Sequence, residues 1–104
     1  MNQLKVIASI VEKSVLRFTP AGIPIATAVL VHESKQEQAS NQRQVEFEIS
    51  AIAAGEISKQ FLEIELGAMT VFTGFLARKN RNSKSLVFHV TGFQKSESQA
   101  NLLD

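Results

Sequence analysis

The amino-acid sequence predicts an all-β domain: a five-stranded antiparallel Greek-key barrel with a short helix or irregular connector between its third and fourth strands. Five segments rich in β-branched and aromatic residues are separated by polar or turn-forming segments. Only one of the gaps between them offers helix-forming residues, whereas a parallel sheet would need a helical crossover after each strand.

Length and composition agree with a single domain. The chain has 104 residues, of which 44% are hydrophobic and 20% charged, as in ordinary globular proteins. It has no cysteine, which excludes disulfides, thiolate metal sites and cysteine nucleophiles. No apolar run approaches the roughly 20 residues that span a bilayer. We therefore expect a cytoplasmic protein without membrane contact.

Residues 3–11 and 23–33 are the first two expected strands, because both are rich in β-branched residues. Between them, Pro20 and Gly22 are a turn signal: proline presets one φ angle, and glycine adopts a positive φ without steric cost. The second strand is apolar on both faces in its middle, which predicts cover by another element or a second subunit. Residues 34–42 are polar without periodicity, which predicts a mobile loop.

Residues 43–51 alternate strictly between apolar and polar, which predicts a half-buried strand with Phe47 toward the core. In residues 52–66, alanines and apolar residues at helical spacing favour a helix, but Gly55 argues against a long one. We expect a short helix or irregular connector that closes one end of the barrel.

Residues 70–77 and 85–93 are the fourth and fifth expected strands. Gly74, inside the fourth, predicts a bend or bulge of the kind that barrels use at their corners. Periodicity is lost near the end of the chain. We therefore expect one domain over residues 1–94 and a flexible C-terminal tail over residues 95–104.

Five strands with a single long interruption match the OB-fold. An SH3-like barrel is the structural alternative, but it usually has shorter strands and lacks the gap before the fourth strand. The sequence contains no nucleophile elbow, Walker loop or dinucleotide-binding glycine motif. His32 and His89 lack the third ligand that a metal site would need. We predict a protein that is not an enzyme and uses no cofactor or metal.

Positive charge gathers in one segment. Residues 66–96 carry five Lys or Arg and no Asp or Glu. Four of these cations lie in or beside the turn between the last two strands: Arg78, Lys79, Arg81 and Lys84. Clustered cations attract a polyanion and gain from counterion release, but a charge run can also be simply solvated. Composition alone favours the solvated interpretation.

The first, second and fourth strands hold more apolar positions than one small barrel interior needs. Candidates for a dimer seam are Ile7, Val29, Val31 and Phe72. A dimer would place two basic loops on one particle and raise the effective affinity without new contacts. The alternative is deeper packing under the 52–66 connector.

The segment 66–76, LGAMTVFTGFL, resembles the G-x-x-V-x-V-x-G-x-L pattern of bacterial single-stranded DNA-binding proteins, with threonine at one apolar position. More closely, residues 3–93 resemble the primosomal replication protein N family, single-domain relatives of those proteins. The shared elements are the S/T-P-x-G-I-P turn at 19–24, Val29-Leu30-Val31-His32, Arg43-Gln44, Gly67, Gly74-Phe75-Leu76 and a basic loop leading to His89.

This resemblance implies an OB-fold homodimer that binds single-stranded DNA. It further implies a primosome accessory protein that stimulates the primosomal helicase PriA, works with the primosomal protein DnaT and helps reload the replicative helicase during replication restart. Two alternatives remain: an OB-fold protein-assembly adaptor with little nucleic-acid affinity, and an RNA-binding OB domain.

The resemblance also implies contact residues. Lys79, Arg81 and Lys84 match the basic loop positions of the family, and Arg78 extends the cluster. Arg17, in the first loop, matches another basic position. The predicted nucleic-acid-binding residues are therefore Arg17, Arg78, Lys79, Arg81 and Lys84. Phe18 is the best candidate for base stacking by its loop position, but a core or interface role is the interpretation that we favour.

Departures from the family predict weak binding. Binders of single strands usually stack bases on exposed aromatic residues, yet this chain has no Trp or Tyr. Glu46 stands where the family can place an aromatic residue, and Glu33 stands where it can place a cation. Glu48 shares the outward face of the strand with Glu46. Because carboxylates repel phosphates, we predict weak, strongly salt-sensitive DNA binding led by the basic loop.

Overall fold

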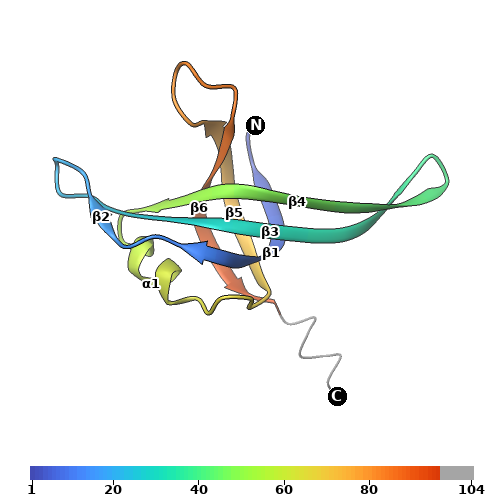
Figure 1. The fold of residues 1–104 in the computed structure, drawn as a ribbon, viewed down its shortest axis with the longest axis horizontal. Coiled ribbons are helices and arrows are strands. Elements are labelled where there is room, and N and C mark those ends of the chain that lie inside the picture. The colour runs from blue at the N-terminus through green and yellow to red at the C-terminus, as the bar shows by residue number, and fades with distance from the viewer. Residues whose placement is uncertain (97–104) are drawn as a thin grey trace.

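The computed structural model describes residues 1–96 as one curved sheet with a single short helix (Figure 1). The elements along the chain are β1 (Leu4–Lys13), β2 (Arg17–Phe18), β3 (Pro24–Gln38), β4 (Asn41–Ala54), α1 (Ile57–Glu63), β5 (Thr70–Arg78) and β6 (Leu86–Lys95). The five long strands correspond to the five predicted ones, and β2 is a short addition beside β3.

The sheet closes into a barrel because β1 pairs with two strands. The strand order is β1-β5-β6-β4-β3-β2, and a further pairing joins β1 to β3. The first half of β1, Leu4–Ala8, pairs with β5, and the second half pairs with β3 from Ser9 onward, with a register shift between Ile10 and Glu12. All pairings are antiparallel except that of β4 with β6. The predicted OB-type barrel, with its helix between the third and fourth long strands, is confirmed.

The prediction of a mobile loop at residues 34–42 is wrong. β3 and β4 stay paired from Ile25↔Ala54 out to Gln38↔Asn41, and only Ala39 and Ser40 form the turn. Both turn residues have positive φ, at 53° and 67°, as a two-residue type I′ turn requires. The hairpin projects well past the barrel (Figure 1), so both of its faces meet water and its residues are polar without a core-facing period.

Phe47 lies on this projecting arm. Its position in the alternation is the inward one, as predicted, but its side chain is 39% exposed. The expected orientation toward the core is therefore only half right, because the barrel interior ends before the strand reaches this residue. Phe47 instead packs against His32, its direct partner on β3, with 4.9 Å between the ring centroids.

The connector contains the short helix that the sequence favoured, but the strand before it is longer than expected. β4 continues to Ala54, Gly55 turns the chain at φ +84°, and α1 begins at Ile57. Ser58 donates a hydrogen bond to the Gly55 carbonyl at 2.7 Å, and Phe61 is fully buried. The helix thus closes one end of the barrel with an aromatic ring.

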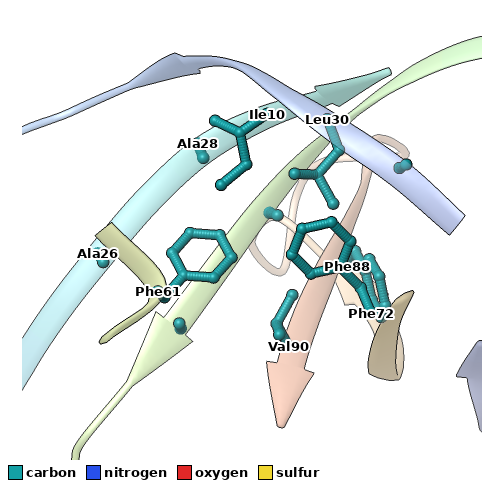
Figure 2. Packing of buried hydrophobic residues seen from close by; sticks show 11 residues of the cluster. Ile10, Ala26, Ala28, Leu30, Phe61, Phe72, Phe88 and Val90 are labelled. Carbon is teal, nitrogen blue, oxygen red and sulfur yellow. The ribbon is translucent and has the colours of Figure 1, made fainter. Parts of the chain in front are cut away.

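The core is built from three phenylalanines and smaller apolar residues (Figure 2). Phe61 and Phe72 meet at 64° with 6.0 Å between ring centroids, an edge-to-face geometry that aromatic pairs favour. Phe72 has no exposed surface. It has nothing to offer a second subunit, so its assignment to a dimer seam is wrong.

The bulge predicted at Gly74 is present. The β5–β6 register shifts between Thr73 and Gly74, and Gly74 is buried against the neighbouring strand. A Cβ atom built on this glycine would stand 1.8 Å from the carbonyl oxygen of His89. Glycine is therefore required here by the close approach of two backbones.

The C-terminal strand β6 runs through Lys95, one residue past the expected domain boundary, and the Ser96 N–H bonds to the Met69 carbonyl at 3.1 Å. The expected tail from residue 97 onward lies outside the described residues. Within residues 1–96, no helix has the length and apolarity needed to cross a membrane.

Candidate nucleic-acid interface

A groove of about 440 Å³ crosses the outer face of β3, β4 and β6. Strand alternation builds its floor, because residues that neighbour buried core positions must point outward. The outward side chains that line the floor are Thr27, Val29, Ser50, Ile52, Val87 and His89. The floor is mostly apolar, and it lies where OB-folds bind oligonucleotides: the face of the second and third barrel strands between the first and last loops.

Two predicted cation positions, far apart in the sequence, line this same groove. Arg17 lies in β2, which follows β1 in the chain, and Lys79 lies at the base of the β5–β6 hairpin. Glu12 and Lys13 also line the groove. The Lys13 ammonium, however, donates a hydrogen bond to the Leu62 carbonyl at 2.7 Å, where it stabilises the C-terminal end of α1. Arg17 and Lys79 are therefore the cations best placed to meet a phosphate.

The wall that carries Arg17 is tied to the floor. The Ser14 N–H donates to the Thr27 carbonyl at 3.0 Å, and the Ser14 and Thr27 hydroxyls form a short hydrogen bond. At the foot of this wall, Arg17 pairs with Ile25 on β3. These bonds fix the backbone from which the guanidinium extends.

The basic loop between β5 and β6 is held by hydrogen bonds within itself. Asn80 accepts one from the Asn82 N–H at 2.9 Å, and the Ser83 hydroxyl accepts one from the Ser85 N–H at 3.0 Å. At its base, the Lys79 N–H donates to the Ser85 carbonyl at 2.9 Å. Such side chain–backbone bonds define a turn, so the loop presents its cations from an ordered backbone.

The structure separates the four cations of this loop. Lys79 faces the groove. Arg78, one residue before it in the strand, points to the opposite face by alternation. Arg81 and Lys84 are exposed near the loop tip and are not part of the groove lining. They extend positive charge outward from the Lys79 end of the groove.

Phe18 does not join the groove. It follows Arg17 in the two-residue strand β2, so the two side chains point to opposite faces. Phe18 pairs with Pro24 and is 62% exposed. Of the two residues of β2, Arg17 lines the groove and Phe18 does not.

Toward the projecting arm, the same outer face carries negative charge. Val29 of the groove floor is followed outward on β3 by Val31 and Glu33. Their partners on β4 are Glu48 and Glu46 respectively. Glu33 thus stands directly opposite Glu46, an arrangement that costs free energy through like-charge repulsion. The outer face therefore has cations at the rim of the groove and three carboxylates, Glu33, Glu46 and Glu48, where the arm begins.

Sequence reasoning missed an aromatic pair beside the groove. Phe75 and His89 are cross-strand partners on the outer face, and Phe75 is 39% exposed. Their rings are stacked, with 4.8 Å between centroids and 3° between planes. The sequence did hold a signal for an exposed aromatic residue here, because strand alternation over residues 72–75 places Phe72 inside the barrel and Phe75 on its outer face. Within residues 1–96, no group of three His, Cys, Asp or Glu side chains could hold a metal ion.

Comparison with known proteins agrees with this architecture. Residues 2–92 match the model of a family described as another single-strand binding protein family. Replication restart protein PriB of Nitrosomonas europaea is 43% identical over 89 residues, which cover 86% of this chain and 82% of the relative. PriB of Neisseria meningitidis serogroup B is 35% identical over 95 residues, or 90% and 94% of the two chains.

Solved structures show the same relationship. PriB from Ralstonia solanacearum superposes with a TM-score of 0.84 at 40% identity, covering 91% of this chain and 97% of the other. A deletion mutant of the single-stranded DNA binding protein from Thermus aquaticus has a TM-score of 0.73 at 17% identity, covering 96% of this chain and 52% of the other, and supports the fold alone. On these grounds the chain belongs to the replication restart protein PriB (primosomal replication protein N) family, within the single-strand binding proteins.

Proposed function

We propose that this protein binds single-stranded DNA in the groove across β3, β4 and β6 during replication restart. The observation that carries the proposal is the position of Arg17 and Lys79 on the walls of one groove with a mostly apolar floor. Membership of a family whose relatives are named replication restart proteins supports the same conclusion.

The groove suits a flexible single strand better than a duplex. Cations at its rim can contact phosphates, while the apolar floor accepts base faces, which are exposed only in an unpaired strand. The strand continues from Lys79 toward Arg81 and Lys84 at the loop tip. Four phosphate contacts would give a salt slope, log Kobs against log salt, of about −3. The carboxylates of the arm confine the strand to a path across the sheet.

The protein acts in the cytoplasm as a primosome accessory rather than as an enzyme. In this proposal it stimulates the helicase PriA, works with DnaT, and helps reload the replicative helicase. DNA affinity is weak because few cations face the groove and the neighbouring arm is acidic. Its contribution therefore rests as much on protein contacts as on DNA contacts.

The proposal includes a homodimer whose seam contains Ile7 and Val31. Ile7 is 37% exposed on the outer side of β1, and the next outward residue, Ser9, pairs with Val31 on β3. Val29 lines the groove, so we assign it to DNA binding rather than to the seam. An Ile7→Asp variant should shift the sedimentation coefficient from dimer to monomer. An unchanged coefficient, at concentrations where the wild type is dimeric, would remove Ile7 from the seam.

Fluorescence anisotropy tests the DNA site. A labelled oligothymidylate of about 12 nucleotides, within the roughly 4–16 that one OB-fold covers, is titrated with protein across a salt series. Arg17→Ala and Lys79→Ala should each reduce the slope by about 0.7. Lys59→Ala removes the same charge from an exposed position of α1, outside this groove, and should leave the slope unchanged. Equal effects of Lys59 and Lys79 would refute the assignment.

Two further probes separate the alternatives. An RNA oligonucleotide of the same sequence should bind no better than DNA, because preference for the 2′-hydroxyl would indicate an RNA-binding domain. No salt-dependent binding of any oligonucleotide would indicate a protein-assembly adaptor instead.

A further inference from the structure

The rings of Phe75 and His89 stack on the outer face of the sheet, where His89 lines the groove. Their centroid separation of 4.8 Å equals the spacing of neighbouring strands, about 4.7–4.9 Å, and their planes are parallel within 3°. The two rings therefore face each other across β5 and β6. Phe75 covers one face of the imidazole, and the other face turns toward β4.

On its β4 side, the His89 ring lies next to Ile52 within the groove lining. Ile52 is its register partner on β4, and both residues line the groove together with Val87. The imidazole is only half-buried, and within residues 1–96 no hydrogen bond engages its nitrogens. A partly exposed aromatic ring beside apolar side chains can stack with a flat nucleobase.

We propose that His89, backed by Phe75, is the wall on which one nucleobase of the bound strand stacks, an inference that rests on the proposed function. Histidine is among the side chains on which unpaired bases stack. Lys79 directly follows β5 and lines the same groove as His89, so a phosphate and a base of one strand can be held there together. Phe75 is a positioning residue that keeps the imidazole upright.

A second histidine–phenylalanine pair in the chain provides the contrast. His32 and Phe47 lie 4.9 Å apart but are tilted by 30°. Both nitrogens of His32 are engaged, one by the Ile7 carbonyl and the other by the Ser34 hydroxyl. This pair occupies inward positions of the arm and does not line the groove. Phe47 has the same 39% exposure as Phe75, which makes it a matched control.

The first experiment compares two probes by anisotropy: the labelled oligothymidylate, and an abasic oligonucleotide with the same number of phosphates. His89→Ala should weaken binding of the oligothymidylate about tenfold, within the roughly five- to 150-fold that one stacked base represents. It should leave abasic binding unchanged. Phe75→Ala should act in the same direction with a smaller effect, and Phe47→Ala should change neither. Lys79→Ala should weaken both probes.

The second experiment uses the absence of tryptophan from the chain. A His89→Trp variant carries one fluorophore at the proposed wall, and its emission should be quenched by the oligothymidylate and not by the abasic probe. Phe47→Trp carries the same fluorophore on the arm and should show no quenching by either. Because this readout follows a single ring, it also serves if His89→Ala folds poorly.

The outcomes separate the two proposals. If the wild type binds no oligonucleotide even at low salt, the proposed function fails, and the stacking wall fails with it. If the wild type binds, but His89→Ala weakens both probes equally or neither, the stacking wall is refuted while the DNA site stands. Absence of oligothymidylate-specific quenching in His89→Trp would refute it independently.

Discussion

The imidazole of His32 donates a hydrogen bond from Nδ1 to the carbonyl oxygen of Ile7 at 2.6 Å. β1 changes partner strand just after this carbonyl, from β5 at Leu4–Ala8 to β3 from Ser9 onward. The His32 side chain on β3 thus bonds to β1 at Ile7, a residue that the β1–β3 backbone pairing does not include. Ser34 holds the other ring nitrogen at 2.8 Å, which fixes the orientation of the imidazole.

This hydrogen bond predicts that His32→Ala loses about 0.5–1.5 kcal/mol of unfolding free energy, the usual net contribution of one intramolecular hydrogen bond. His32→Asn should lose less, because an amide N–H can occupy a position near Nδ1. Urea denaturation measures both. Wild-type stability in His32→Ala would show that the bond does not hold β1 to β3.

Burial of Phe72 predicts a large cost on truncation. Phe72→Ala should lower the unfolding free energy by about 3–5 kcal/mol, because it leaves a cavity among Phe61, Phe93 and their neighbours. Phe18→Ala makes the same chemical change at a side chain that is 62% exposed and should cost under about 0.5 kcal/mol. Denaturant midpoints compare the two. Similar losses would contradict the placement of Phe72 in the core.

Gly74 and Gly92 offer a paired test of backbone approach. In Gly74→Ala the new methyl group would meet the His89 backbone carbonyl at 1.8 Å, whereas at Gly92 nothing lies within 4 Å of an added Cβ. Gly74→Ala should therefore force β5 and β6 apart and destabilise the fold by about 1–3 kcal/mol or more. Gly92→Ala should stay within about 0.5 kcal/mol of wild type. Thermal melts of the two variants measure this difference in stability.

The barrel was predictable because its information is local. Alternation in residues 43–51 and 70–77, the turn at Pro20-Gly22 and the glycine at 74 each carried a specific physical signal. The projecting arm was not predictable by the same means. Its turn residues Ala39 and Ser40 lack the Asn-Gly signature of a type I′ turn, and a ribbon exposed on both faces has no apolar period.

The candidate site was likewise predictable only in part from the sequence. Charge clustering pointed to Lys79, and resemblance pointed to Arg17, but only three-dimensional register shows that both line one groove. Phe75 and His89 lie 14 positions apart, and their stacking depends on the register of β5 against β6. Phe18 could not be excluded from sequence, because the face on which it lies depends on the two-residue strand β2.

Reversing one charge on the arm should strengthen both the fold and DNA binding. Glu46 stands directly opposite Glu33 on the outer face of the hairpin, so Glu46→Lys replaces repulsion with a cross-strand ion pair. We expect a stability gain of a few tenths of a kcal/mol up to about 1 kcal/mol. The same change removes a carboxylate and adds a cation near the groove, so oligothymidylate should bind more tightly, most visibly at low salt. Glu46→Gln, which removes the charge without reversing it, should give an intermediate result in both assays. Weaker DNA binding by Glu46→Lys would mean that the strand does not cross this face of the sheet.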